Sequence, residues 1–272
     1  MANGKKDNGS NAGGMMTGLI IVGCIIVGYL VWKFIMGASS HFVGGNNAGD
    51  ALPGDYLGMV YKGGPIVPVL LGCLLMVIVF SVERFMVISK ASGKASIDSF
   101  MRKVQSNISS GDIEGAIENC DNQKGSVANA IKSALLKYQD VKKEGLDSEK
   151  AAESIHKEIE EATSLEMPML EKHMTILSTL VSLGTLAGLL GTVTGMIKAF
   201  GALASTGTPD QALLASGISE ALINTATGIS TSALAIIMYN LFTSKIDTLT
   251  YSIDEAGSAI VNTNRRYAGS KK

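Results

Sequence analysis

Residues 211–244 decide the fold, and they read QALLASGISEALINTATGISTSALAIIMYNLFTS. Nearly all of these side chains are apolar or small, and Glu220 is the one that ionises. The hydrocarbon core of a bilayer is about 30 Å thick, and about 20 helical residues cross it. The stretch is therefore long enough to span a membrane, and its carboxylate, amide and hydroxyl groups require an explanation.

Three further windows, 8–32, 63–82 and 174–197, contain no Asp, Glu, Lys or Arg. Hydrophobic residues make up 46% of the chain, and its mean hydropathy is +0.27. Buried helices of a soluble protein are the alternative, but four windows of this length favour a bilayer. We therefore predict an all-α membrane protein whose long transmembrane helices extend into a cytoplasmic helical bundle.

The polar region after the second window begins with basic residues that include Lys90 and Lys94, and positive charges of this kind mark the cytoplasmic side. Its apolar residues recur at spacings of three and four between breaks at 109–111 and at Gly125, which predicts amphipathic helices. About ten residues join the last two windows, too few for a domain. These two windows therefore form a hairpin whose tip lies opposite the cytoplasmic bundle.

The first hydrophobic segment, 18–35, is also compatible with a secretory signal peptide, because Lys5 and Lys6 precede it and small residues follow it. Against this, the leader is long and contains Asp7, and Trp32 and Lys33 stand where a cleavage region has small residues. We expect a retained helix and two cytoplasmic termini.

The predicted segments alternate between polar and membrane-spanning stretches. In chain order they are a disordered cytoplasmic N-terminus at 1–14, an additional transmembrane helix (or signal peptide) at 15–37, a periplasmic connector at 38–62, a transmembrane helix at 63–88, a cytoplasmic helical domain at 89–172, a transmembrane helix at 173–203, a periplasmic turn at 204–210, a transmembrane helix at 211–244 and a cytoplasmic C-terminal tail at 245–272.

Polar side chains of the third window share one stripe at about 100° per residue. Taking Thr192 as the origin, Ser178 and Thr185 fall on the same side of the helix. Glycines crowd an adjoining face, which allows another helix backbone to approach closely. They are Gly184, Gly188, Gly191 and Gly195.

The fourth window has a larger polar face, formed by Glu220, Asn224, Thr227 and Thr231. A second face, which holds Thr225 and Ser232, lies about 100° beyond it. Such faces need a helix partner or a water-filled path, although hydroxyls in membrane helices commonly bond to their own backbone. Glu220 differs from the hydroxyl residues, because a charged group within a membrane usually marks an ion or proton route.

Composition and motifs argue against several other classes of protein. The net charge is −1 and no basic cluster suggests nucleic acid. The three cysteines have no metal-ligand spacing and are interpreted as apolar filler, and the histidines His41, His156 and His173 are interpreted as isolated surface residues. The run GLLGTVTG lacks the end of a phosphate loop. We expect neither an enzyme nor a metal or cofactor site.

Residues 167–200, MPMLEKHMTILSTLVSLGTLAGLLGTVTGMIKAF, together with GISEALINTATGISTSALAIIMYNLF at 217–242, resemble the MotA/TolQ/ExbB proton channel family. Glu83-Arg84-Phe85 at the end of a hydrophobic segment also fits, and the modest polar domain is most similar to that of ExbB. The resemblance covers about residues 65–245. It implies a multi-pass protein of the bacterial inner membrane.

The resemblance implies a homopentamer whose last two transmembrane helices enclose a pore that holds an ExbD-like single-span dimer. A TonB-like energy-transducing protein is the implied further partner, and protons are the implied ion. The pore-facing threonines of the family fall on Thr192 and Thr225, and its functional glutamate falls on Glu220. Ser178, Thr185, Asn224, Thr227 and Thr231 are additional candidates for polar pore or interface positions.

Two features depart from the family pattern. Leu234 stands where the family usually has a proline, and segment 18–35 is additional to the family's three membrane helices. Two alternative functions stay open: a TolQ-like role in envelope maintenance, and a non-conducting membrane scaffold in which the hydroxyl stripes are packing seams.

Overall fold

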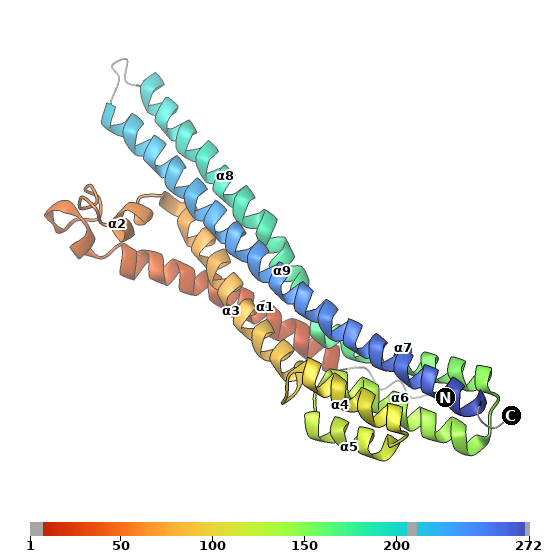
Figure 1. Ribbon diagram of the computed structural model, residues 1–272. Helices are drawn as coiled ribbons and strands as arrows, with labels where there is room; N and C mark the ends of the chain where they lie inside the picture. The colour runs from red at the N-terminus through yellow and green to blue at the C-terminus, as the bar shows by residue number, and fades with distance from the viewer. Residues whose placement is uncertain (1–7, 206–210, 270–272) are drawn as a thin grey trace. The chain divides into compact units, whose positions relative to one another are not determined.

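The computed structural model describes residues 8–205 and 211–269, and helices dominate these ranges (Figure 1). The one pairing of extended backbone in the described ranges is an antiparallel bridge between Phe42 and Ala51. Nine α-helices lie in these ranges: α1 (Asn8–Leu30), α2 (Tyr56–Tyr61), α3 (Val67–Ser92), α4 (Ile97–Ser110), α5 (Ile113–Gln123), α6 (Ser126–Glu144), α7 (Ser148–Glu171), α8 (Met174–Ser205) and α9 (Gln211–Gly269).

Four helical stretches of the described chain are long and apolar enough to cross a membrane, which agrees with the predicted all-α multi-pass membrane protein. They are Gly14–Met36, Gly64–Ser110, Ser148–Gly201 and Gln211–Arg265. The helices divide between two compact units, 1–81 with 176–238 and 82–175 with 239–272, and α3, α8 and α9 contribute to both.

In the first unit, α1 packs against α3 through glycine. A Cβ atom added to Gly28 would lie 2.7 Å from the backbone nitrogen of Gly72 and 2.8 Å from the carbonyl oxygen of Pro68, so only a residue without a side chain fits there. Small residues at such crossings let helix backbones approach closely. The additional N-terminal helix is thus an integral part of this unit.

Local contacts between side chains stabilise the segment between α1 and α3. A π-helical turn at Val31–Met36 ends α1, and the Trp32 ring stacks on Tyr61 with the ring centroids 4.7 Å apart. Asp55 caps α2 by accepting from the backbone nitrogens of Leu57 and Gly58. Its other carboxylate oxygen lies 2.7 Å from His41 Nδ1, and this hydrogen bond lowers the pKa of Asp55.

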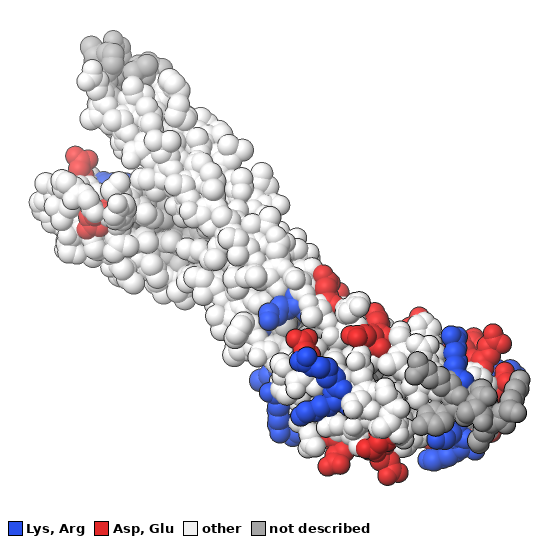
Figure 2. Space-filling view, viewed as in Figure 1, with Lys and Arg blue, Asp and Glu red and all other residues white. Residues whose placement is uncertain are grey.

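In the second unit, α4 to α7 form a helical bundle with the C-terminal part of α9. Left-handed glycines, Gly111 and Gly145, end α4 and α6, and Asp112 caps α5. The predicted breaks at 109–111 and at Gly125 are confirmed. Figure 2 shows lysine, arginine, aspartate and glutamate side chains gathered over this unit, whereas the visible face of the first unit is almost free of them outside the α2 region.

Arg84 is buried in the second unit and lies against the end of α7. Its guanidinium donates to the carbonyl oxygens of Met169 at 3.0 Å and Leu170 at 3.2 Å, and it pairs with Glu83. His173 Nδ1 lies 3.1 Å from Glu83 Oε2. The last carbonyls of a helix have no partner within it, so Arg84 satisfies groups that would otherwise be left unpaired.

Three sequence interpretations need correction. Residues 8–14 are helical rather than disordered, because an apolar helix already nucleated extends at little cost; residues 1–7 lie outside the described ranges. Residues 245–269 continue α9 and do not form a separate tail; the predicted turn at 204–210 falls largely on undescribed residues. All three histidines lie beside carboxylates rather than isolated, His41 with Asp55, His173 with Glu83 and His156 with Glu160, although His156 is exposed as expected.

The interpretation of the cysteines as filler is confirmed. Cys24, Cys73 and Cys120 are all buried and none is in a disulfide. Burial raises the pKa of the Cys120 thiol to about 12, which makes it a poor nucleophile at neutral pH.

Candidate functional site

Helices α8 and α9 lie side by side in the first unit along a seam of glycines (Figure 1). A Cβ atom added to Gly228 would lie 2.6 Å from the carbonyl oxygen of Gly184 and 2.8 Å from the Cα of Gly188. Backbone therefore meets backbone at this crossing, and no side chain separates the helices. The glycine face predicted from the sequence is the face by which α8 contacts α9.

Thr192 of α8 and Thr225 of α9 meet next to this seam and share a hydrogen bond between their hydroxyl groups. Each hydroxyl also lies near a carbonyl of its own helix, Thr192 3.2 Å from Gly188 and Thr225 3.1 Å from Ala221. Both threonines are half-buried. The structure thus brings together the two threonines that the resemblance singled out, at an edge of the α8–α9 pair.

An open hollow of about 600 Å³ lies on α8 beside this pair. Its lining is apolar except for Thr192, and all of its residues come from the C-terminal half of α8. They are Thr192, Val193, Met196, Ile197, Phe200 and Gly201. A threonine at the edge of an apolar hollow gives a neighbouring helix one polar anchor in an otherwise apolar contact.

Glu220 takes part in a different contact. Its Oε1 lies 2.6 Å from Nζ of Lys198 on α8, and the Glu220 residue is 9% exposed while the Lys198 side chain is 54% exposed. Gly64 covers the carboxylate from the short turn Gly64–Ile66, and a Cβ atom there would collide with Glu220. The φ of Gly64 is +79°, so the turn requires glycine for its conformation as well as for space.

Asn224 lies one turn along α9 from Glu220 and is completely buried. Its Nδ2 donates to the carbonyl oxygen of Gly63 at 2.8 Å, while its Oδ1 has no partner among the described residues. A Cβ atom added to Gly191 would collide with the Asn224 side chain, so α8 also closes over it. The main polar face of α9 is thus covered on both sides.

The remaining candidate residues differ in the contacts that they make. Thr185 donates to Ser232 at 2.9 Å across the helix pair, beside the glycine seam. Thr227 and Thr231 donate to backbone carbonyls one turn earlier in α9, at 2.8 and 2.9 Å, which is the packing behaviour common for hydroxyls in membrane helices. Ser178 is exposed on α8.

Lys198 is the functional candidate that sequence reasoning missed, because it lies just beyond the uncharged window that ends at residue 197. The register of the α8–α9 hairpin would have pointed to Lys198, because it places Lys198 opposite Glu220. Thr185 with Ser232, Thr192 with Thr225, and Lys198 with Glu220 each lie almost equally far along the chain from residue 208. In an antiparallel pair of helices, such residues lie opposite each other.

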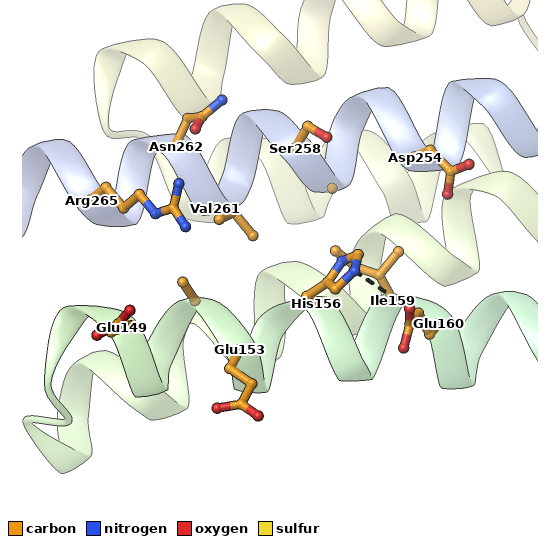
Figure 3. A pocket seen from close by; sticks show the side chains of 12 residues that line it. Glu149, Glu153, His156, Ile159, Glu160, Asp254, Ser258, Val261, Asn262 and Arg265 are labelled. Atoms are coloured by element: carbon orange, nitrogen blue, oxygen red, sulfur yellow. Dashed lines mark ion pairs between the residues drawn. The ribbon is translucent and has the colours of Figure 1, made fainter.

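A second hollow, about 740 Å³ in volume, lies in the other unit between α7 and the C-terminal part of α9 (Figure 3). Glu149, Glu153, Glu160 and Asp254 make it acidic, and His156 Nε2 lies 3.4 Å from Glu160. In the described part of the chain, no three His, Cys, Asp or Glu residues are placed to hold a metal ion. The groove is a solvated, charged surface.

Comparisons with known proteins agree with the resemblance of the α8–α9 sequence. Residues 121–255 match the model of the MotA/TolQ/ExbB proton channel family. The Tol-Pal system protein TolQ of Pseudomonas aeruginosa is 35% identical over 105 residues, which cover 39% of this chain and 46% of that protein.

Two further relatives are biopolymer transport proteins named ExbB. The biopolymer transport protein ExbB of Pseudomonas putida is 26% identical over 140 residues, or 52% of this chain and 43% of that protein. ExbB of Salmonella typhimurium is 32% identical over 85 residues, or 31% of this chain and 35% of that protein. The chain therefore spans less than half the length of these curated relatives.

Proposed function

Because this chain belongs to the MotA/TolQ/ExbB proton channel family, we propose that it is the proton-channel subunit of an inner-membrane motor that uses the proton motive force. In this proposal several copies, five by analogy with the family, surround a pore lined by α8 and α9. An ExbD-like dimer of single-span helices occupies the pore, and a TonB-like protein carries the energy to outer-membrane transport.

The contact between the Thr192 and Thr225 hydroxyls is the observation that supports this proposal most directly. Hydroxyl groups donate and accept hydrogen bonds but do not titrate near neutral pH, so they are able to hold a hydrated proton path without storing the proton. Their half-buried position beside an open hollow leaves them within reach of a helix from another chain.

Proton movement needs a titrating group in addition to the hydroxyls. Glu220 is the carboxylate of residues 174–205 and 211–244, and a carboxyl group on the partner helix is the second group that the proposal requires. Each proton that crosses releases about 2.3 kcal/mol per 100 mV of membrane potential. Repeated protonation of the partner carboxyl removes and restores its charge, and this drives stepwise movement of the partner helices.

A TolQ-like role in envelope maintenance is a second candidate, because both TolQ and ExbB proteins are among the relatives. The two roles share the motor and differ in the protein that it drives. Identification of the single-span and energy-transducing proteins that co-purify with the chain distinguishes between them.

Substitution of the paired threonines tests the proposal. The chain is expressed with its single-span partner, purified, and placed in liposomes that hold a pH-sensitive dye. We expect Thr192→Val and Thr225→Val to lower proton flux by about tenfold or more, the effect of about 1.4 kcal/mol on a barrier, with assembly unchanged. Thr194→Val is the control, since among the described residues its hydroxyl donates to carbonyls of its own helix, those of Leu190 and Gly191, each at 3.1 Å.

A purely structural scaffold predicts the opposite result. If both valine variants conduct and energise transport as the wild type does, the hydroxyl stripe is a packing seam and the channel assignment fails.

A further inference from the structure

Charged residues are rare in the apolar parts of α8 and α9. In 174–205 the one Asp, Glu, Lys or Arg residue is Lys198, and in 211–244 it is Glu220. The structure brings these two together at 2.6 Å. Two lone opposite charges on adjacent helices would meet only if the hairpin register and the rotation of both helices placed them opposite each other.

The pair is asymmetric in its exposure. The Glu220 side chain is 11% exposed and lies under Gly64, whereas the Lys198 side chain is 54% exposed. A long lysine side chain is able to run along apolar surface while its ammonium reaches water. The buried member of the pair is therefore the carboxylate, and the lysine supplies its counter-charge from the more open side.

In residues 8–205 and 211–269, the ion pair of Glu220 is with Lys198. Lys198 reaches it from α8, Gly64 covers it with backbone from the turn before α3, and Asn224 on α9 directs its own amide to Gly63. Among the described residues, the carboxylate of Glu220 accepts a hydrogen bond from Lys198, while Thr192 and Thr225 bond to each other. The carboxylate is held on a face of α9 other than that of the threonine pair.

We infer that Lys198 is a positioning residue that holds Glu220 as a carboxylate against the Gly64 turn and limits its exchange of protons while the motor is at rest. This inference rests on the proposed function and deepens it. Proton exchange at Glu220 then requires the ion pair to open. The ion pair joins α8 to α9, and it must break before the carboxylate is released.

The inference predicts different effects for two substitutions of the same residue. Lys198→Met keeps much of the side-chain volume but removes the charge, so Glu220 loses its counter-charge and the ion pair no longer restrains it. Lys198→Arg keeps the charge and the reach. We expect Lys198→Met to increase passive proton flux about fivefold or more, a change typical of coupled sites, and to change the pH profile of that flux. Lys198→Arg restores the wild-type profile.

Two measurements on the purified, partner-bound complex test this. The first is dye-reported proton flux in liposomes between pH 5 and pH 9 for the wild type, Lys198→Met and Lys198→Arg. The second is infrared spectroscopy, which reads the protonated carboxyl stretch without need of transport. At neutral pH this stretch is expected in Lys198→Met but not in the wild type, and Lys198→Met combined with Glu220→Gln removes it.

The outcomes separate the two claims. A wild-type complex that conducts no protons overturns the proposed function, and the infrared measurement still decides the role of Lys198. A wild-type complex that conducts, with Lys198→Met matching it in flux, pH profile and infrared spectrum, leaves the function standing and overturns the inference. If Lys198→Arg behaves as Lys198→Met does, charge is not the property that matters, and the inference is again overturned.

Discussion

Asn224 of α9 donates its side-chain amide to the carbonyl oxygen of Gly63 at 2.8 Å, a contact between residues 161 positions apart in the chain. The asparagine is completely buried, and the carbonyl belongs to the turn that also covers Glu220. One hydrogen bond therefore fastens the start of α3 to the polar face of α9. The additional N-terminal helix packs on the same α3 through Gly28.

Removal of this amide is expected to weaken the first unit. Asn224→Ala leaves the buried Gly63 carbonyl without its partner, and leaving such a group unsatisfied costs about 1–3 kcal/mol. We expect the free energy of unfolding in detergent to fall by about that amount. Ser230→Ala on the same helix is the matched control, because Ser230 is exposed. Equal stability of the two variants contradicts the prediction.

The glycine seam allows a second test of the helix pair. Gly228→Ala places a Cβ atom 2.6 Å from the Gly184 carbonyl oxygen, and the backbone there has no flexible side chain to move aside. We expect α8 and α9 to separate and the complex to lose stability by about 1–3 kcal/mol, as overpacked sites do. Gly201→Ala is the control, since nothing lies within 4 Å of its added Cβ. Thermal melting of both variants in the same detergent compares them.

The connector between α1 and α3 is expected to respond to acid. The hydrogen bond from His41 lowers the pKa of Asp55 below its ordinary value of about 3.9, so the folded state favours the charged carboxylate. The stabilisation is therefore complete above about pH 4 and is lost as the pH falls through the lowered pKa. Trp32, the chain's single tryptophan, stacks on Tyr61 of this segment and reports the change by fluorescence.

The control for this titration keeps the helix cap. Asp55→Asn retains an oxygen for the backbone nitrogens of Leu57 and Gly58 but loses the charge, so we expect its acid transition in Trp32 fluorescence to disappear. Asp50→Asn is expected to show the same fluorescence transition as the wild type, since Asp50 accepts from the backbone nitrogen of Val43 through its backbone oxygen. An unchanged transition in Asp55→Asn would show that another carboxyl group is responsible.

Arg84 provides a prediction for the second unit. Its side chain is 1% exposed, and its guanidinium pairs with Glu83 and donates hydrogen bonds to two carbonyls at the end of α7. Arg84→Met removes this donor from the carbonyls of Met169 and Leu170 and leaves Glu83 with His173 alone. Loss of one partner of a buried ion pair costs about 3–5 kcal/mol. Because Glu83 is partly exposed, we expect the lower end of this range. Chemical denaturation is the measurement, and exposed Arg102→Met, expected to be near neutral, is its control.

Much of the fold could be read from the sequence, because the evidence for it is local. Uncharged windows predicted the membrane helices, and apolar residues at spacings of three and four predicted the helices of the bundle. The glycines at 111 and 125 predicted the breaks between those helices. The end of the last helix was not predicted. The hydrophobic pattern that identifies a transmembrane helix ends near residue 244, but the polar residues after it continue α9 to Gly269.

Part of the candidate site was also accessible. The threonines Thr192 and Thr225 came from the resemblance, and the glycine face came from helical spacing. Lys198 was missed, because a window defined by the absence of charge stops where the charge begins. The burial of Asn224 against Gly63 was equally out of reach, since nothing near either residue in the sequence indicates the other.

The sequence alone determined that this chain has long apolar helices, with one carboxylate and a row of hydroxyls in residues 211–244. Hydropathy and helical period are properties of neighbouring residues, so they need no knowledge of the rest of the fold. Only the tertiary structure decided which polar groups meet. That depends on the register of the α8–α9 hairpin and on the rotation of each helix, which glycine contacts between distant segments fix. The same packing pairs Thr192 with Thr225 and Lys198 with Glu220.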